Sequence, residues 1–265
     1  MRFSPLHWVG KALARYLSKP RDGRSHVSTS HPSLLAETLR KGDVLLVEGS
    51  SRFSTAICYL TQSTWSHSAL YVGDALPESP DGNRQWLVEA DINEGVRAVP
   101  LHAYVALHTR ICRPIGLAAS ETDQLVAYAI KRIGNHYDLR NVFDLVRYLI
   151  GTPPVPNRLR RQMLALGSGD PTRAICSSLI AEAFESVRYP VLPDIEVMRQ
   201  RGADGRCHAR EILHIRHSSL FMPRDFDVSP YFQIIKPMLE HDFDPHRVNW
   251  APRSPGDAAP SDPHT

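Results

Sequence analysis

The stretch ICSSLIAEAF, residues 175–184, is the part of the chain around which the other segments can be interpreted. Helical spacing of its apolar residues predicts a helix with one buried face, formed by Leu179, Ile180, Ala183, Phe184 and Val187. Pro171 and Thr172 upstream are typical of a helix start, which places Cys176 in the first turn. Free backbone N–H groups and the helix dipole there favour a thiolate, the form that attacks carbonyls. The stretch alone leaves open the alternative that Cys176 is only a buried packing residue.

Length and composition indicate one globular domain with extensions, in a chain of 265 residues with 42% hydrophobic residues. The net charge of +3 does not indicate a nucleic-acid partner. The four cysteines are scattered and form no CxxC pair, which favours free thiols in a reducing compartment. Cys207, His208, His214 and His217 are of metal-binding types, but their spacing matches no standard zinc pattern. We therefore expect neither a metal nor another cofactor, and keep zinc binding as a weaker alternative.

The two ends of the chain differ in composition from its centre. Residues 1–38 are expected to form a basic amphipathic helix and a linker, and residues 241–265 a Pro-rich disordered tail. Within the first segment, residues 4–17 suit a helix at a membrane interface, a helix docked on the domain, or an adaptor for a partner. Because no apolar run is long enough to cross a bilayer and no secretory signal is evident, we expect a cytoplasmic protein, with peripheral membrane contact left open.

Short apolar segments between turn residues predict strands at residues 44–47, 65–74, 85–90, 96–101 and 108–113. Helices are expected within residues 50–64, at 120–133 with Ser120 as N-cap and Gly134 as stop, and at 141–150. Residues 158–166 form a short basic amphipathic segment, interpreted as a solvated excursion or a rim. Residues 190–221 are expected to alternate turns and charges, and residues 232–239 to form a last ordered segment.

Three residue types needed for thiol catalysis occur in this pattern: a nucleophile, a base and a group that orients the base. Cys176 supplies the first, and His67 supplies the second because imidazole titrates near neutral pH. A hairpin of residues 65–74 and 85–90 would place His67 and Glu89 roughly opposite each other at its open end. Each residue also has an ordinary explanation, as a hydrogen-bonded histidine or an exposed charge at a strand end.

These motifs together resemble a known family. The strand WSHSALYVGD at residues 65–74, preceded by KGDVLL at 41–46, is similar to permuted papain-like proteins of the YiiX/YebB type. These are relatives of the NlpC-type cell-wall peptidases and of lecithin:retinol acyltransferase. The resemblance continues through VEA at 88–90, IGNHYD at 133–138 and residues 175–184, with a weaker echo at MPRDFD, 222–227. The order is distinctive, because the histidine strand precedes the cysteine helix.

The resemblance implies an α+β fold over residues 39–240, circularly permuted and papain-like, with a small antiparallel sheet packed on helices and the catalytic cysteine at a helix N-terminus. It implies a thiol-dependent hydrolase or acyltransferase acting on an amide or ester through an acyl-enzyme. The family's nucleophile corresponds to Cys176, its base to His67 and its third member to Glu89. Tyr137 corresponds to a tyrosine that lines the substrate site, although a purely structural role for Tyr137 is equally compatible.

The substrate class stays open among a small molecule, a peptide, a peptidoglycan fragment, and a lipid amide or ester. One alternative is a non-catalytic lipid- or acyl-binding protein at the membrane surface, built on the same fold. A nucleic-acid partner is not expected, because the basic cluster Arg158, Arg160 and Arg161 lacks interleaved aromatic residues and a known module.

Overall fold

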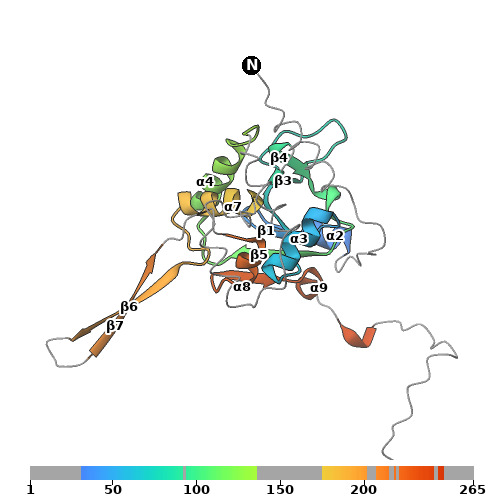
Figure 1. The fold of residues 1–265 in the computed structure, drawn as a ribbon. Coiled ribbons are helices and arrows are strands. Elements are labelled where there is room, and N and C mark those ends of the chain that lie inside the picture. The colour runs from blue at the N-terminus through green and yellow to red at the C-terminus, as the bar shows by residue number, and fades with distance from the viewer. Residues whose placement is uncertain are drawn as a thin grey trace, which may run out of the picture.

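The structure, a computed structural model, describes residues 31–91, 94–135, 175–201, 207–214, 218, 221–241 and 244–247. A six-stranded sheet with the order β4-β3-β2-β1-β5-β8 runs through the body of the molecule (Figure 1). Every neighbouring pair of its strands is antiparallel. The strands are β1 (Val44–Val47), β2 (His67–Gly73), β3 (Trp86–Asp91), β4 (Gly95–Pro100), β5 (Thr109–Pro114) and β8 (Phe232–Ile235).

Helices of different lengths surround this sheet. They are α2 (Pro32–Thr38), α3 (Arg52–Thr61), α4 (Ala119–Ile130), α7 (Ile175–Ser186), α8 (Pro223–Val228) and α9 (Pro237–Glu240), with the 3-10 turns η1 (Leu101–Ala103) and η3 (Pro245–Arg247). The combination of helices with an antiparallel sheet confirms the expected α+β class. In the described part of the chain, no helix is long and apolar enough to span a membrane.

Strand β1 shows why both faces of the sheet are buried. Its four apolar residues are 0–1% exposed, and they alternate between two clusters of core residues. Val44 and Leu46 belong to the cluster that includes residues of α4 and α7. Leu45 and Val47 belong to the cluster with Leu35 of α2. Because side chains alternate along a strand, an unbroken apolar run is what a sheet covered on both faces requires.

Helix α7 packs its apolar residues into the larger of these clusters. Leu179, Ile180 and Phe184 are each at most 1% exposed. The ring of Phe184 contacts the rings of Phe226 and Phe232, with centroids 6.3 and 5.1 Å away. The helix predicted from residues 175–184 is therefore confirmed, and its buried face fixes the position of Cys176 at its first turn.

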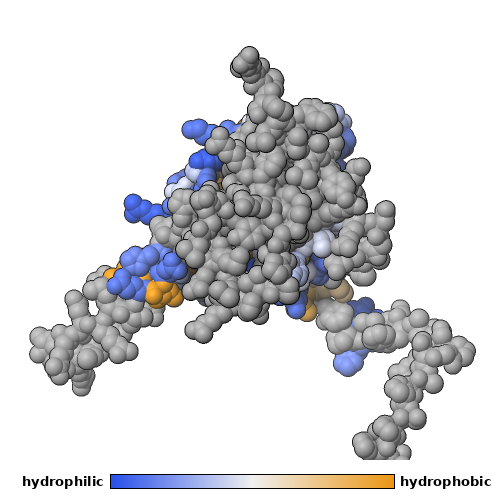
Figure 2. Space-filling model, viewed as in Figure 1, coloured by the Kyte–Doolittle hydropathy of each residue, from blue (hydrophilic) through white to orange (hydrophobic). Residues whose placement is uncertain are grey.

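A projecting hairpin replaces the turns that we expected between residues 190 and 221, and that prediction was wrong. Strand β6 (Asp194–Arg201) pairs antiparallel with β7 (Cys207–His214), and the two strands extend away from the sheet (Figure 1). Hydrophobic surface is visible near the base of this arm (Figure 2). Ile195 and Leu213 pair there and are 55% and 44% exposed. Strand β6 was missed because it mixes charged and apolar residues, and such a mixture is also typical of a loop.

Two further expectations can be compared with the fold. Helix α4 begins at Ala119 with Ala118 as N-cap, so Ser120 is not the cap. The Glu121 carboxylate accepts the Ala118 backbone N–H instead, at 2.8 Å. Leu35, on the N-terminal side of the expected domain boundary at residue 39, contributes to the core. The predicted helices at 4–17 and 141–150 and the basic segment at 158–166 lie outside the described residues.

Candidate active site

His67 stands at the first position of β2, an inner strand of the sheet, opposite Val47 of β1. The preceding residue ties the strand to β1, because the Ser66 backbone N–H donates to the Val47 carbonyl at 3.1 Å. Trp65 is buried, and its indole N–H donates to Asp227 Oδ2 on α8 at 3.0 Å. The start of β2 is thereby held on both sides, while the His67 side chain keeps 23% of its surface exposed.

Glu89 lies on the neighbouring strand β3 and reaches the His67 ring. The distance between His67 Nε2 and Glu89 Oε2 is 2.5 Å. The Glu89 side chain is only 1% exposed, and its other oxygen accepts a hydrogen bond from Arg97 Nε. Residue Leu70 pairs with Val88, so Glu89 is not directly opposite His67 by strand register. The two side chains meet because residues two apart on a strand share a face.

Cys176 is the second residue of α7 and is 5% exposed. Its neighbour Ser177 is fully buried and lies 3.1 Å from the Ser68 hydroxyl, which links the first turn of α7 to β2. The Cys176 thiol consequently faces the start of β2, where it interacts with His67 and Ser68. Because Glu89 occupies Nε2 of His67, the imidazole atom left for the thiol is Nδ1.

Cys176, His67 and Glu89 shift one another's pKa values toward their charged forms. Burial disfavours the charge on His67, but the Glu89 carboxylate and Cys176 together hold its pKa well above 6.5. Burial also disfavours the Cys176 thiolate, yet the His67 charge and hydrogen bonds from His67 and Ser68 lower the thiol pKa below its ordinary 9.0. Against its own burial, Glu89 has a pKa of about 2, chiefly because of His67. Each group therefore favours the charged form of its neighbour: the imidazolium favours the thiolate and the carboxylate, and both of these favour the imidazolium.

The structure brings together Cys176, His67 and Glu89, which the sequence analysis named from segments far apart in the chain. Tyr137 lies outside the described residues. Of the alternative metal ligands, His214 bonds Glu196 on the projecting hairpin, with 2.7 Å between Nε2 and Oε2. Among the residues whose placement is described, no group of three or more histidine, cysteine, aspartate or glutamate side chains is arranged to hold a metal ion.

Two residues of this site were missed by sequence reasoning. Arg97 pairs directly with Glu89 across the β3–β4 hairpin, and its Nε and Nη2 both lie 2.9 Å from Glu89 Oε1. A signal for Arg97 existed, because the turn at residues 93–95 fixes which residue faces Glu89. Tyr104, just after η1, donates its hydroxyl hydrogen to Glu89 Oε2. No sequence pattern indicated Tyr104, since the path of an irregular segment after a strand is set by tertiary packing.

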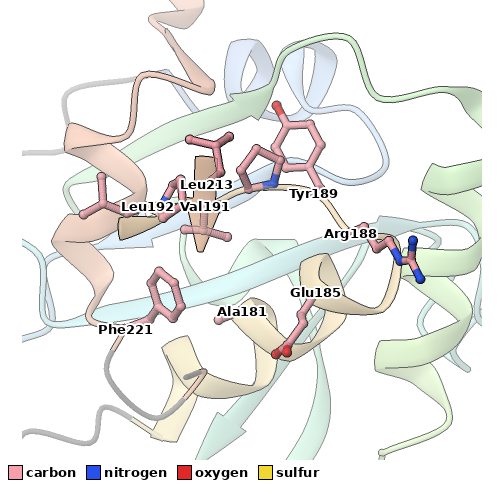
Figure 3. Close-up of a pocket in the computed structure, with 10 residues that line it drawn as sticks. Ala181, Glu185, Arg188, Tyr189, Val191, Leu192, Leu213 and Phe221 are labelled. Carbon is pink, nitrogen blue, oxygen red and sulfur yellow. The ribbon is translucent and has the colours of Figure 1, made fainter. Parts of the chain in front are cut away.

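A pocket lies at the opposite end of α7 from Cys176 (Figure 3). Ala181 and Glu185 of α7 line it together with Leu213 of β7 and Phe221. His67, Glu89 and Cys176 do not line this pocket. The pocket lies between α7 and the base of the projecting hairpin, and it is distinct from the candidate active site.

A family model and a solved structure are similar to this chain. Residues 38–148 match the model of the permuted papain-like amidase enzymes of the YaeF/YiiX, C92 family. That segment contains His67, Glu89, Arg97 and Tyr104 and ends before Cys176. A crystal structure of the metalloprotein yiiX from Escherichia coli O157:H7 is similar with a TM-score of 0.43 and 15% identity, covering 74% of this chain and 96% of that chain. No curated protein matches the chain.

Proposed function

We propose that this chain is a cysteine hydrolase of amide or ester bonds. Residues 38–148 match the model of the permuted papain-like amidase family of the YaeF/YiiX type, which supports the proposal. In this proposal Cys176 is the nucleophile, His67 the general base and acid, and Glu89 the residue that orients His67. One observation carries it: a thiol in the first turn of a helix faces an imidazole whose far nitrogen is bonded to a buried carboxylate. A cysteine that serves only to fill the core does not require a histidine and a carboxylate beside its thiol.

The reaction begins from the thiolate–imidazolium pair. The Cys176 sulfur attacks the carbonyl carbon of the substrate, and the carbonyl oxygen becomes an oxyanion. The first N–H groups of α7 have no partner within the helix, so the Cys176 backbone N–H is available to stabilise that charge. As the tetrahedral intermediate collapses, the bond to the leaving nitrogen or oxygen breaks. His67 gives that atom its proton, leaving a thioester between the acyl group and Cys176.

Water completes the cycle. His67, now neutral, takes a proton from a water molecule whose oxygen attacks the thioester carbonyl. The carbon–sulfur bond breaks, the carboxylic acid product leaves, and the thiolate and imidazolium are restored. Another nucleophile in place of water would make the same site an acyltransferase. Glu89 does not exchange a proton in either half, because its pKa of about 2 keeps it ionised.

Alkylation of Cys176 in the full chain tests the proposal without a known substrate. Iodoacetamide labelling is followed by mass spectrometry at each cysteine from pH 5 to 9. We expect Cys176 to react well below its free-thiol range of about pH 8.5, because the thiolate is the reactive form. The partly exposed Cys58 is the internal comparison. Equal, slow labelling of Cys176 and Cys58 in the folded protein would leave the non-catalytic acyl-binding role as the better explanation.

A second measurement addresses turnover. Wild type and Cys176→Ala are compared with an acyl activity probe and then with libraries of peptide amides, peptidoglycan fragments and lipid amides and esters. The expected result is labelling and hydrolysis by wild type and neither by the variant. The nature of the first hydrolysed member defines the substrate class. A peripheral membrane contact through residues 4–17 is part of the same proposal and is tested by vesicle sedimentation of the full chain.

A further inference from the structure

The Glu89 carboxylate takes part in three hydrogen bonds and one further ion-pair contact. An ionised carboxylate offers about four lone-pair positions, two on each oxygen. Oε1 accepts from Arg97 Nε and lies beside Nη2, both at 2.9 Å. Oε2 accepts from His67 Nε2 at 2.5 Å and from the Tyr104 hydroxyl. Each partner brings a hydrogen, so this is a cage built for the charged form of the carboxylate.

The cage has two consequences for His67. A protonated Glu89 would direct its own hydrogen at a donor, so the surrounding groups oppose protonation by geometry as well as by charge. His67 must then keep a hydrogen on Nε2, because Oε2 can only accept. The remaining nitrogen, Nδ1, is therefore the one that exchanges a proton with Cys176. The tautomer and charge of the imidazole depend on groups that do not touch the thiol.

Arg97 is itself held in place. Its Nη1 lies 2.9 Å from Glu94 Oε2, and its Nη2 lies 3.9 Å from Asp91 Oδ2. The guanidinium is thus spread across three carboxylates of the β3–β4 hairpin, and 35% of its side chain is exposed. Such a fork cannot turn toward the thiol or a substrate without breaking its bonds to Glu89. Its hydrogen bond therefore reaches the reactive pair only through that carboxylate.

Tyr104 acts on the same carboxylate from the other side. Its ring lies 6.2 Å from the His67 ring, centroid to centroid, with 30° between the planes. The two rings are stacked, so Tyr104 packs beside His67 as well as bonding Glu89. Burial and the nearby Glu89 carboxylate raise the pKa of the Tyr104 phenol, so its hydroxyl hydrogen is retained. Glu89, Tyr104 and Arg97 are thus the titratable or charged side chains of β3, β4 and the segment after η1 that lie around the Cys176–His67 pair.

We propose that Tyr104 and Arg97 are positioning residues that hold the Glu89 carboxylate against His67, which fixes the imidazole with Nε2–H on the carboxylate and Nδ1 toward Cys176. This inference rests on the proposed function, since the Cys176–His67 pair is the reactive pair of that proposal. It assigns the control of thiol reactivity to two side chains that do not contact the sulfur. It also predicts that their removal changes the titration of Cys176 more than the stability of the fold.

The test is the pH profile of Cys176 alkylation by iodoacetamide in full-length Tyr104→Phe. This variant keeps the ring against His67 and removes only the hydrogen bond to Glu89. We expect the midpoint of the profile to rise by about one pH unit, so that labelling below both midpoints is about tenfold slower. Tyr128→Phe is the matched control, because Tyr128 lies on α4 and its ring contacts Arg132. Its profile should equal that of wild type.

Arg97 provides a second, charge-based comparison. Arg97→Gln removes the charge beside Glu89 and should raise the midpoint by at least as much as Tyr104→Phe. Arg97→Lys retains the charge but not the fork, and should restore most of the wild-type profile. A lysine variant as slow as the glutamine variant would show that charge is not what Arg97 contributes and would overturn its part of the proposal.

The results separate this inference from the proposed function. If Tyr104→Phe and Arg97→Gln are folded by circular dichroism and label as wild type does at every pH, positioning through Glu89 is overturned while an activated Cys176 remains. If wild-type Cys176 titrates as an ordinary thiol, both proposals are wrong. If wild type labels at low pH and hydrolyses no member of the libraries, the positioning result still stands and only the turnover is lost.

Discussion

Replacing Glu89 with glutamine gives the sharpest quantitative test of the site. The substitution keeps the size of the side chain and exchanges one oxygen for an NH₂ group. If the amide oxygen stays on Arg97, the NH₂ group meets the hydrogens of His67 Nε2 and the Tyr104 hydroxyl. Either the contacts break or His67 changes its tautomer, with Nε2 unprotonated and a hydrogen on Nδ1. In that state the imidazole can no longer take the Cys176 proton.

The magnitude follows from the pKa of Glu89. Its pKa in the folded protein is about 2, against an ordinary value of 4.5. A lowered pKa means that the folded state stabilises the ionised carboxylate. This contributes about 3 kcal/mol to the free energy of unfolding above pH 4.5, and the contribution is lost as the pH falls toward 2. At pH 3 about half of it remains. Glu89→Gln should therefore unfold about 3 kcal/mol more easily at pH 6, and the difference should be roughly halved at pH 3.

Urea unfolding of both proteins at pH 6 and pH 3, followed by tryptophan fluorescence, measures these free energies. Glu78→Gln is the control, because Glu78 forms an exposed ion pair with Arg84 and the same substitution there should change stability by no more than about 1 kcal/mol. Cys176 in Glu89→Gln should also label near the pH of a free thiol. A stability difference that stays constant between pH 6 and pH 3 would refute the reasoning, since it would show that the ionised carboxylate is not favoured by its surroundings.

Two further predictions concern the framework around the site. Asp227→Ala leaves the buried Trp65 indole N–H and the Arg110 guanidinium without their shared acceptor, and should lower the free energy of unfolding by about 1–3 kcal/mol. Asp123→Ala on the exposed surface is its control, and equal unfolding midpoints for the two variants would contradict the role of Asp227. Phe184→Ala should cost about 3–5 kcal/mol because this ring is fully buried. A change below about 1 kcal/mol by urea unfolding would show that α7 is not anchored by Phe184.

Strongly patterned segments were predictable from the sequence. Strand β1 was predicted with the bounds that the structure has, because a short apolar run between turn residues has few other uses. The helix that carries Cys176 was predicted from its buried face, and the structure confirms it. The meeting of His67 with Glu89 followed from a hairpin, whose register could not be fixed from the sequence and is set in the structure by the pairing of Leu70 with Val88.

Other features depend on contacts that the sequence does not encode locally. The hairpin of β6 and β7 was missed because Asp194–Arg201 mixes charged with apolar residues, a pattern that also occurs in loops. Tyr104 was missed because its hydroxyl reaches Glu89 only through the path that the chain takes after β4. Arg97 was within reach of the reasoning, since the register of the β3–β4 hairpin places it opposite Glu89.

The order of the site residues along the chain has a consequence for biosynthesis. A chain emerging from the ribosome presents His67 and Glu89 first, and helix α7 with Cys176 only after a long further stretch of chain. Until α7 is made, one face of the sheet lacks Leu179, Ile180 and Phe184. The thiol reaches its imidazole only when these residues dock. A nascent chain therefore carries no activated nucleophile, and reactivity at Cys176 appears together with the completed core.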